Sequence, residues 1–308
     1  MSEMSGNPDQ SVGSTARTKK PSPEEPPVVT ASPPLSKRRL SRMLRESRES
    51  AGLTADQVTE RARELGATKW SASKITRLER DEWVRPKLED VELLLDIYRI
   101  TGLADREEYV RLAKEARQKS WWRSYDDVIE GKLTGLEPGA SRIRDVALAV
   151  IPGLLQTQAY ARAVIVGGGI IDAEEIDRRV EARMLRQRIL DPKADGPKYW
   201  AIIDEAALRK IPLAVREEQI RHLSDVQRPD LRIQILPDSA GLHAAVGGGF
   251  TILDFDQDSG LVYTETAASE RVHDDGEDTE AFDHVYQYVS ASALGVQEST
   301  AFLERLIT

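Results

Sequence analysis

Apolar residues recur at helical spacing through the first third of the chain. Leu40, Met43 and Leu44 share one face of a first helix, and Gly52 is placed to end it, because glycine tolerates the left-handed backbone that follows many helices. Four more segments have one apolar face: Val58 and Ala62; Ile75 and Leu78; Val91, Leu94, Leu95 and Tyr98; and Tyr109, Leu112 and Ala116. The pattern predicts an all-α domain over residues 35–119.

From Trp121 onward the pattern changes to a mixture of short strands and helices. Apolar runs predict strands at residues 199–203, 231–236, 249–255 and 261–265. Helical patterns occupy residues 172–190, 215–227, 279–293 and 298–306. We therefore expect an α+β fold class, in which the all-α domain precedes a mixed α+β domain with a small sheet over residues 120–308.

Residues 1–34 have no hydrophobic periodicity. They are rich in Ser, Pro, Thr and Glu and include the runs PSPEEPP and ASPP. Such a composition favours extended chain over a packed core. We expect these residues to form a disordered tail.

Residues 71–80 have the composition of a DNA-recognition helix. Ser71 is a good N-cap, and Ile75 and Leu78 can anchor one edge in a core. The other faces carry hydrogen-bond donors and positive charge, in Ser73, Lys74, Thr76, Arg77 and Arg80. The preceding helix has a capping box, with Thr54 as cap and Gln57 as its partner. Together the two helices predict a helix-turn-helix whose second helix enters a major groove, although an ordinary basic surface helix is the alternative for this segment taken alone.

The distribution of charge supports a DNA-binding domain. The whole chain has a net charge of −9, yet residues 35–88 hold 14 Lys and Arg against 8 Asp and Glu. A local basic region steers a domain toward phosphates even when the rest of the chain is acidic. A solvated helix face is the alternative for the basic cluster at residues 37–48. We predict double-stranded DNA as the partner, contacted by Arg38, Arg39, Arg42, Lys69, Trp70, Ser71, Ser73, Lys74, Arg77 and Arg80.

Residues 40–100 resemble the XRE (phage-repressor-like) helix-turn-helix domain. The match rests on Arg48-x-x-x-Gly52-Leu53-Thr54 and on Ile75-x-x-Leu78-Glu79. The resemblance implies a structural ion pair between Arg48 and Glu79, and it implies base readers at Ala72, Ser73 and Arg77, with Lys74 beside them. The turn at residues 64–69 is several residues longer than is usual, which puts the docking angle of the recognition helix in question.

The second domain resembles that of a large family of actinobacterial XRE-type regulators. The match rests on Pro152-Gly153-Leu154-Leu155-Gln156-Thr157, followed by Tyr160-Ala161-Arg162. This resemblance implies a transcriptional regulator that is often encoded beside a small partner protein and is often described as antitoxin-like. A homodimer is expected by analogy with XRE domains, which usually bind two-fold sites.

Two interpretations of the second-domain motif remain open. Apolar motifs are usually core, so the segment after Pro152 is interpreted first as a strand-to-helix corner. The alternative is a partner or ligand groove lined by Gln156, Thr157, Tyr160 and Arg162. Trp121 and Trp122 allow the same choice, between a packing hinge at the domain junction and a partner interface, where tryptophan is enriched.

Several classes of function are not supported by the sequence. The chain has no cysteine, no transmembrane-length apolar run and no catalytic motif, so we expect a cytoplasmic protein without catalytic residues, cofactor or metal. Asp254, Asp256, Asp258 and Glu265 are spaced like a calcium loop, but their strand-like flanks favour an acidic β-hairpin tip. Residues 273–280 are expected to form a solvated loop.

The leading hypothesis is a sequence-specific DNA-binding transcriptional regulator whose second domain dimerises, binds a partner or senses a ligand. The alternative is an antitoxin-like module that sequesters a small partner and uses DNA binding only for autoregulation.

Overall fold

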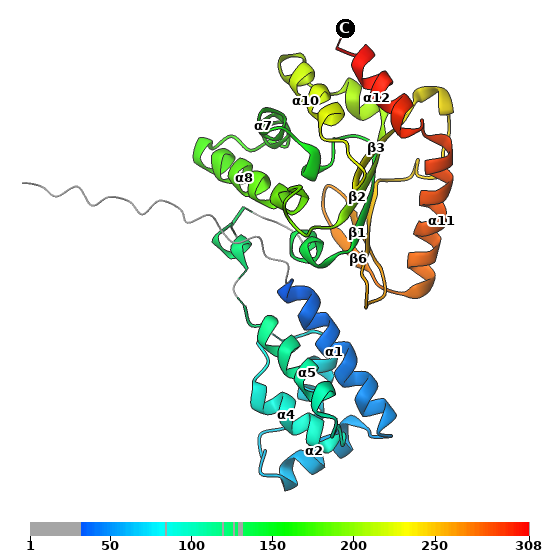
Figure 1. The fold of residues 1–308 in the computed structure, drawn as a ribbon. Coiled ribbons are helices and arrows are strands. Elements are labelled where there is room, and N and C mark those ends of the chain that lie inside the picture. Colours follow the sequence, from blue (N-terminus) through cyan, green and yellow to red (C-terminus); the bar gives the residue numbers. More distant parts are fainter. Residues whose placement is uncertain (1–31, 84, 119, 126, 129–131, 308) are drawn as a thin grey trace, which may run out of the picture.

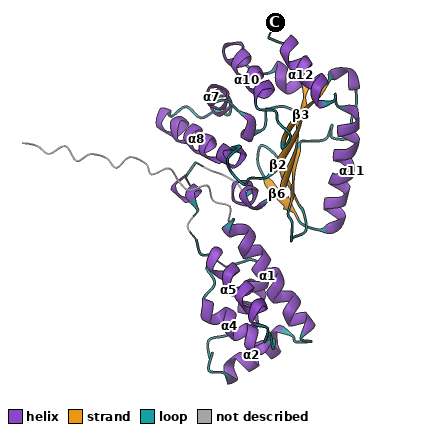
Figure 2. Ribbon diagram, in the orientation of Figure 1, coloured by secondary structure: helices purple, strands orange, loops and turns teal. Residues whose placement is uncertain are grey.

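The computed structural model describes residues 32–307 except 84, 119, 126 and 129–131. It divides into a helical domain and a larger domain built on a sheet (Figures 1 and 2). The helical domain contains α1 (Pro33–Ser50), α2 (Ala55–Glu64), α3 (Ala72–Glu79), α4 (Leu88–Ile97) and α5 (Leu103–Glu115). These five helices confirm the predicted all-α domain, and their apolar faces meet in one core.

The ends of these helices follow from local chemistry. The Thr54 hydroxyl accepts from the backbone N–H of Gln57 at 3.2 Å, and the Gln57 side chain accepts from the Thr54 N–H at 2.9 Å, which confirms the capping box. Gly52 follows α1 with φ +67°, a conformation that favours glycine. Ser71 caps α3 by accepting from the N–H of Lys74. The helix-turn-helix therefore has the predicted order and caps.

Helix α1 begins earlier than predicted. Ser32 is its N-cap and Pro33 occupies its first turn, where the missing proline N–H has no intrahelical role. The last two residues of the predicted tail are thus helical, a correction to the boundary at residue 34. The remainder of that predicted tail lies outside the described residues.

The second domain holds a six-stranded mixed sheet in the order β3-β2-β1-β4-β5-β6. Its strands are β1 (Arg142–Ala147), β2 (Lys198–Asp204), β3 (Leu231–Leu236), β4 (Phe250–Asp254), β5 (Leu261–Glu265) and β6 (Glu270–His273). The first three are parallel and the last three continue the sheet in antiparallel fashion. The four predicted strands are confirmed, whereas β1 and β6 were not predicted.

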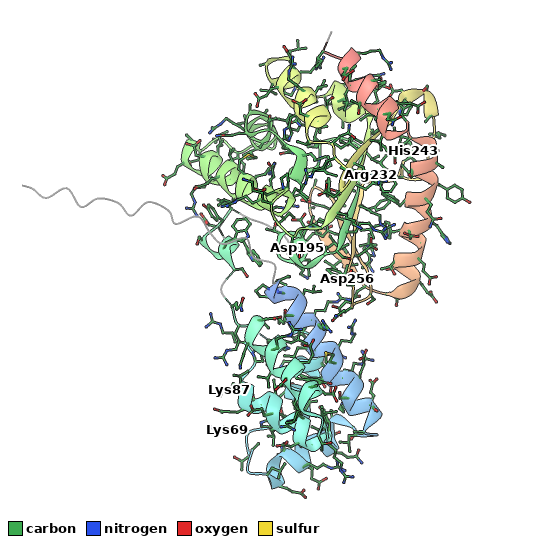
Figure 3. All side chains as sticks on the ribbon, viewed as in Figure 1. Lys69, Lys87, Asp195, Arg232, His243 and Asp256 are labelled. Carbon is green, nitrogen blue, oxygen red and sulfur yellow. The ribbon has the colours of Figure 1, made fainter. Side chains whose placement is uncertain are left out.

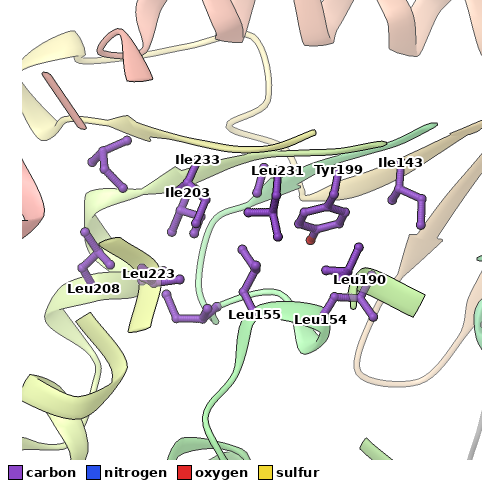
Figure 4. Packing of buried hydrophobic residues seen from close by; sticks show 14 of the residues in the cluster. Ile143, Leu154, Leu155, Leu190, Tyr199, Ile203, Leu208, Leu223, Leu231 and Ile233 are labelled. Atoms are coloured by element: carbon purple, nitrogen blue, oxygen red, sulfur yellow. The ribbon is translucent and has the colours of Figure 1, made fainter. Parts of the chain in front are cut away.

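Helices cover both faces of the sheet. The longer ones are α7 (Gln158–Gly167), α8 (Ala173–Arg186), α10 (Leu213–Asp225), α11 (Gly276–Ser292) and α12 (Val296–Arg305), and α6 (Leu133–Leu136) and α9 (Glu205–Arg209) are short. Helices α7, α8 and α10 lie on one side of the sheet and α11 on the other (Figure 1). Figure 4 shows the larger core, where Leu154 and Leu155 pack beneath Tyr199 and Ile203. The prediction of a loop over residues 273–280 is wrong, because His273 ends β6 and α11 starts at Gly276.

Short 3-10 turns complete the domain. They are η1 (Trp121–Tyr125), η2 (Glu137–Gly139), η3 (Gly153–Leu155), η4 (Gln187–Leu190) and η5 (Asp238–Ala240). The acidic segment that resembles a calcium loop joins β4 to β5, which confirms the predicted hairpin.

Candidate nucleic-acid interface

Helix α3, the predicted recognition helix, is held by its apolar edge and by one ion pair. Ile75 is fully buried and Leu78 nearly so. Arg48 on α1 donates from Nε to Glu79 Oε1 at 2.7 Å and from Nη2 to Glu79 Oε2 at 2.9 Å. Its third donor, Nη1, reaches the carbonyl oxygen of Leu53 at 2.8 Å. The pair implied by the XRE resemblance is therefore present, and it ties the end of α3 to α1 and to the turn before α2.

The polar edge of α3 is exposed. Ser71, Ser73, Arg77 and Arg80 all face solvent. Among the described residues, neither Arg77 nor Arg80 makes an ion pair or side-chain hydrogen bond. Two free guanidinium groups one turn apart on an exposed helix edge can each make bidentate contacts to guanine or to phosphate. These residues form the centre of the candidate interface.

The predicted role of Trp70 in DNA contact is wrong. Its side chain is only 4% exposed and belongs to the core of the helical domain. The long turn folds back to place it there: the Ala67 N–H donates to Ala62 O at 2.9 Å, and Arg63 Nη2 donates to the carbonyl oxygen of Trp70 at 3.0 Å. The lengthened turn thus ends at the buried Trp70, immediately before α3.

Lys74 is also not free to read bases. Its ammonium lies 2.8 Å from a carboxylate oxygen of Asp90 on α4 and 4.2 Å from the centre of the Trp70 ring. Both contacts attract a cation, and the first is an ion pair between half-buried groups. We therefore reassign Lys74 from base readout to the packing of α3 against α4.

Two cations that the sequence reasoning missed lie after α3. Arg85 and Lys87 are exposed, and Lys87 is the N-cap residue of α4. Figure 3 shows Lys69 and Lys87 at the same side of the helical domain. Backbone N–H groups at the start of α4 add to this positive potential. The signal in the sequence was the short basic run around Pro86, which interrupts the helical pattern.

The arginines of α1 have partners within the chain. Arg38 lies 3.1 Å from Asp274 of the second domain, and Arg42 is bonded to Asp258 at the tip of the β4–β5 hairpin. Arg39 pairs with Glu108 of α5 at 3.2 Å. Each of these three guanidinium groups thus has a carboxylate partner within the chain, with which a phosphate would have to compete, and their role as phosphate contacts stays a prediction.

The predicted groove after Pro152 is a packed corner. Gln156 is 2% exposed; its side-chain amide donates to Ile151 O at 2.7 Å and accepts from Arg183 Nη1 at 2.8 Å. Burial lowers the pKa of Arg183 to about 10. Thr157 caps α7, and the buried Tyr160 hydroxyl accepts from the Ile151 N–H at 3.3 Å. The groove interpretation is wrong for these three residues, since their polar atoms bind the fold itself.

The remaining groove residue and the two tryptophans lie nearer the surface. Arg162 is exposed and pairs with Asp177 across α7 and α8. Trp121 and Trp122 are half-buried in η1, with ring centres 6.0 Å apart in an edge-to-face arrangement. Tyr125 packs on Trp121 in the same way at 6.1 Å. The three rings form an aromatic cluster at the junction between the two domains.

In the part of the chain that the structure describes, no helix is long and apolar enough to cross a bilayer. Within the same residues no three His, Cys, Asp or Glu side chains gather in a way that could hold a metal ion.

Comparison with known families identifies both domains. Residues 39–108 match a helix-turn-helix domain, and residues 131–305 match a domain of unknown function (DUF5753). No curated protein and no solved structure matches the chain.

Proposed function

The chain belongs to the family that shares the domain of unknown function (DUF5753), and we propose that it is a sequence-specific DNA-binding transcriptional regulator. The observation that carries the proposal is the exposed edge of α3, where Ser73, Arg77 and Arg80 are presented by a helix whose opposite edge is buried. Arg77 would pair with a guanine in the major groove. Lys69, Arg85 and Lys87 would contact phosphates on either side.

The test uses DNA selected from a random pool by the full chain. Arg77→Ala should weaken binding to the selected site by about 1–3 kcal/mol and relax the preference at one base pair, because a bidentate contact to one base is lost. Affinities are measured on the selected site and on a shuffled duplex at several salt concentrations.

Lys114→Ala is the matched control, because Lys114 is an exposed cation on α5 of the same domain and has no ion pair with any residue that the structure describes. It should change neither affinity by more than a factor of about two. Equal losses on the selected and shuffled duplexes for Arg77→Ala would reduce Arg77 to a phosphate contact. Failure of selection to enrich any sequence would contradict the proposed function.

We further propose that the second domain mediates self-association. Large apolar side chains are exposed on it, among them Ile171 and Leu242, both 92% exposed, and Tyr288, which is 71% exposed. Isolated apolar residues are common on protein surfaces. The proposed self-association is therefore supported by the number of large exposed apolar side chains on this domain. We expect light scattering of the full chain to give the mass of two chains. A mass of one chain at micromolar concentration would contradict the dimer.

The antitoxin-like alternative, with a small partner from a neighbouring gene, stays a prediction from the resemblance. The same holds for a cytoplasmic location, and a binding role without catalysis is part of the present proposal.

A further inference from the structure

A cleft of about 1050 Å³ lies between the two domains. Its walls come from α1, from the turn that follows α3, from the segment around Trp122, and from α6 and the strand ends near Asp274. Small-molecule sites commonly have volumes of about 300–1000 Å³ and occur preferentially at domain interfaces. The size and position of this cleft are those of a ligand site.

The domains are joined at both ends of the cleft. At one end the Ser32 hydroxyl donates to the carbonyl oxygen of Gly135 on α6. A Cβ atom at Gly135 would lie 2.8 Å from Pro34 Cγ and 3.3 Å from Trp122 Cζ2, so the start of α1 packs directly on α6. At the other end lie the ion pairs of α1 with Asp258 and Asp274. The cleft is therefore bounded by contacts from both domains.

Positive charge predominates along the cleft. Six basic and four acidic side chains line it. Lys37, Arg38 and Lys132 surround Asp81. Burial raises the pKa of the Asp81 carboxyl, and the three cations oppose that rise. Lys132 is exposed, and among the described residues its ammonium makes no direct ion pair or hydrogen bond. An anion entering the cleft would meet cations from both domains.

The cleft also has an aromatic wall in a fixed orientation. The Trp83 indole N–H lies 2.9 Å from Ser41 Oγ and 3.0 Å from the carbonyl oxygen of Leu78, and it donates to both acceptors. Lys37 Nζ lies 5.1 Å from the centre of the Trp83 ring. Trp122 lines the cleft as well. An indole ring beside an ammonium group suits a ligand that combines negative charge with a planar apolar body.

We propose that this cleft binds a small anionic ligand with an aromatic or apolar body, held by Lys37, Arg38 and Lys132 against the Trp83 and Trp122 rings. The site also touches the recognition helix. Asp81 directly follows the α3 C-cap residue in a left-handed conformation, with φ +61°, and Lys37 lies 3.2 Å from its carboxylate. A ligand that draws Lys37 away from Asp81 acts on the end of α3.

The experiment uses the full chain and two probes with the same aromatic skeleton, without DNA. One is 8-anilinonaphthalene-1-sulfonate, which carries a negative charge, and the other is the uncharged N-phenyl-1-naphthylamine. Lys132→Glu should weaken binding of the anionic probe about fivefold and leave the neutral probe unchanged, because reversing the charge acts only on a charged ligand. Lys210→Glu is the control, since Lys210 is an exposed lysine of the second domain that does not line the cleft.

Amide hydrogen exchange gives the location independently. Adding the anionic probe should change the protection of residues 80–83 and leave that of α11 unaltered. Equal effects of the two lysine substitutions, or equal responses of the two probes, would overturn the proposal, as would exchange unchanged at residues 80–83. The proposed function is not at stake in these measurements, because they do not involve DNA.

Discussion

Replacing Glu79 with alanine is expected to lower the free energy of unfolding of the helical domain by about 2–4 kcal/mol. The Glu79 carboxylate is 8% exposed and accepts two hydrogen bonds from Arg48, which is itself 16% exposed. The substitution leaves that guanidinium largely buried and without its main partner. Glu49, 3.5 Å from Arg48, offers a weaker replacement, which keeps the loss below that of a fully isolated charge.

The measurement is hydrogen exchange of the α1 and α3 amides across a urea series, which reports the helical domain separately within the full chain. Asp96→Ala is the control, because Asp96 is 60% exposed in its pair with Arg106. Such surface pairs contribute about 0–1 kcal/mol. If both substitutions cost the same, the Arg48–Glu79 pair is not what holds α3 in place.

The elements that could be predicted from the sequence are those whose pattern is local. Strands β3 and β5 occupy the predicted residues 231–236 and 261–265, since their apolar side chains alternate or run together within the strand itself. The caps at Thr54 and Ser71 depend on residues three positions away, which a sequence shows directly. The Arg48–Glu79 pair could be anticipated because the resemblance supplied it.

The missed strand β1 shows where local patterns end. It places Arg144 and Asp145 in the middle of a sheet. A segment with two charged residues at its centre does not predict a buried strand. Asp145 accepts from the hydroxyls of Tyr199 and Thr251, and Arg144 pairs with Asp254 and with Asp283. These partners lie at least 54 positions away, so only the tertiary fold makes the charges tolerable.

The residues of α3 that would face DNA could be predicted only in part, for the same reason. Lys74 and Arg77 are both cationic positions on the non-apolar faces of α3, and nothing in residues 71–80 separates them. Asp90 of α4 removes Lys74 from the interface, whereas Arg77 has no partner within the described residues. Residues 37–48 likewise could not show that Asp258 and Asp274, more than 200 positions away, lie against Arg42 and Arg38 and would compete with phosphates for them.

Glu137→Ala is expected to destabilise the second domain by about 3–5 kcal/mol. Glu137 is 2% exposed and accepts from Arg186 Nε at 2.7 Å and from Nη2 at 2.6 Å. Arg186 Nη1 would lie 3.4 Å from a Cβ atom at Gly153, so the same guanidinium lies against the corner after Pro152. Removing the carboxylate takes away the partner to which Arg186 is hydrogen-bonded and leaves it the weaker attraction of Asp145.

The double variant Glu137→Met/Arg186→Met separates the cost of an isolated charge from the cost of lost packing. Because both charges leave together and apolar volume is retained, it should recover at least half of the stability lost in Glu137→Ala. The stabilities of Glu137→Ala and of the double variant are measured by hydrogen exchange of the β1 and β2 amides across a urea series. Glu217→Ala is the control, since the Arg221–Glu217 pair is 58% and 70% exposed and should contribute little. A double variant no more stable than Glu137→Ala would mean that the corner depends on the shape of this ion pair and not on its charge balance.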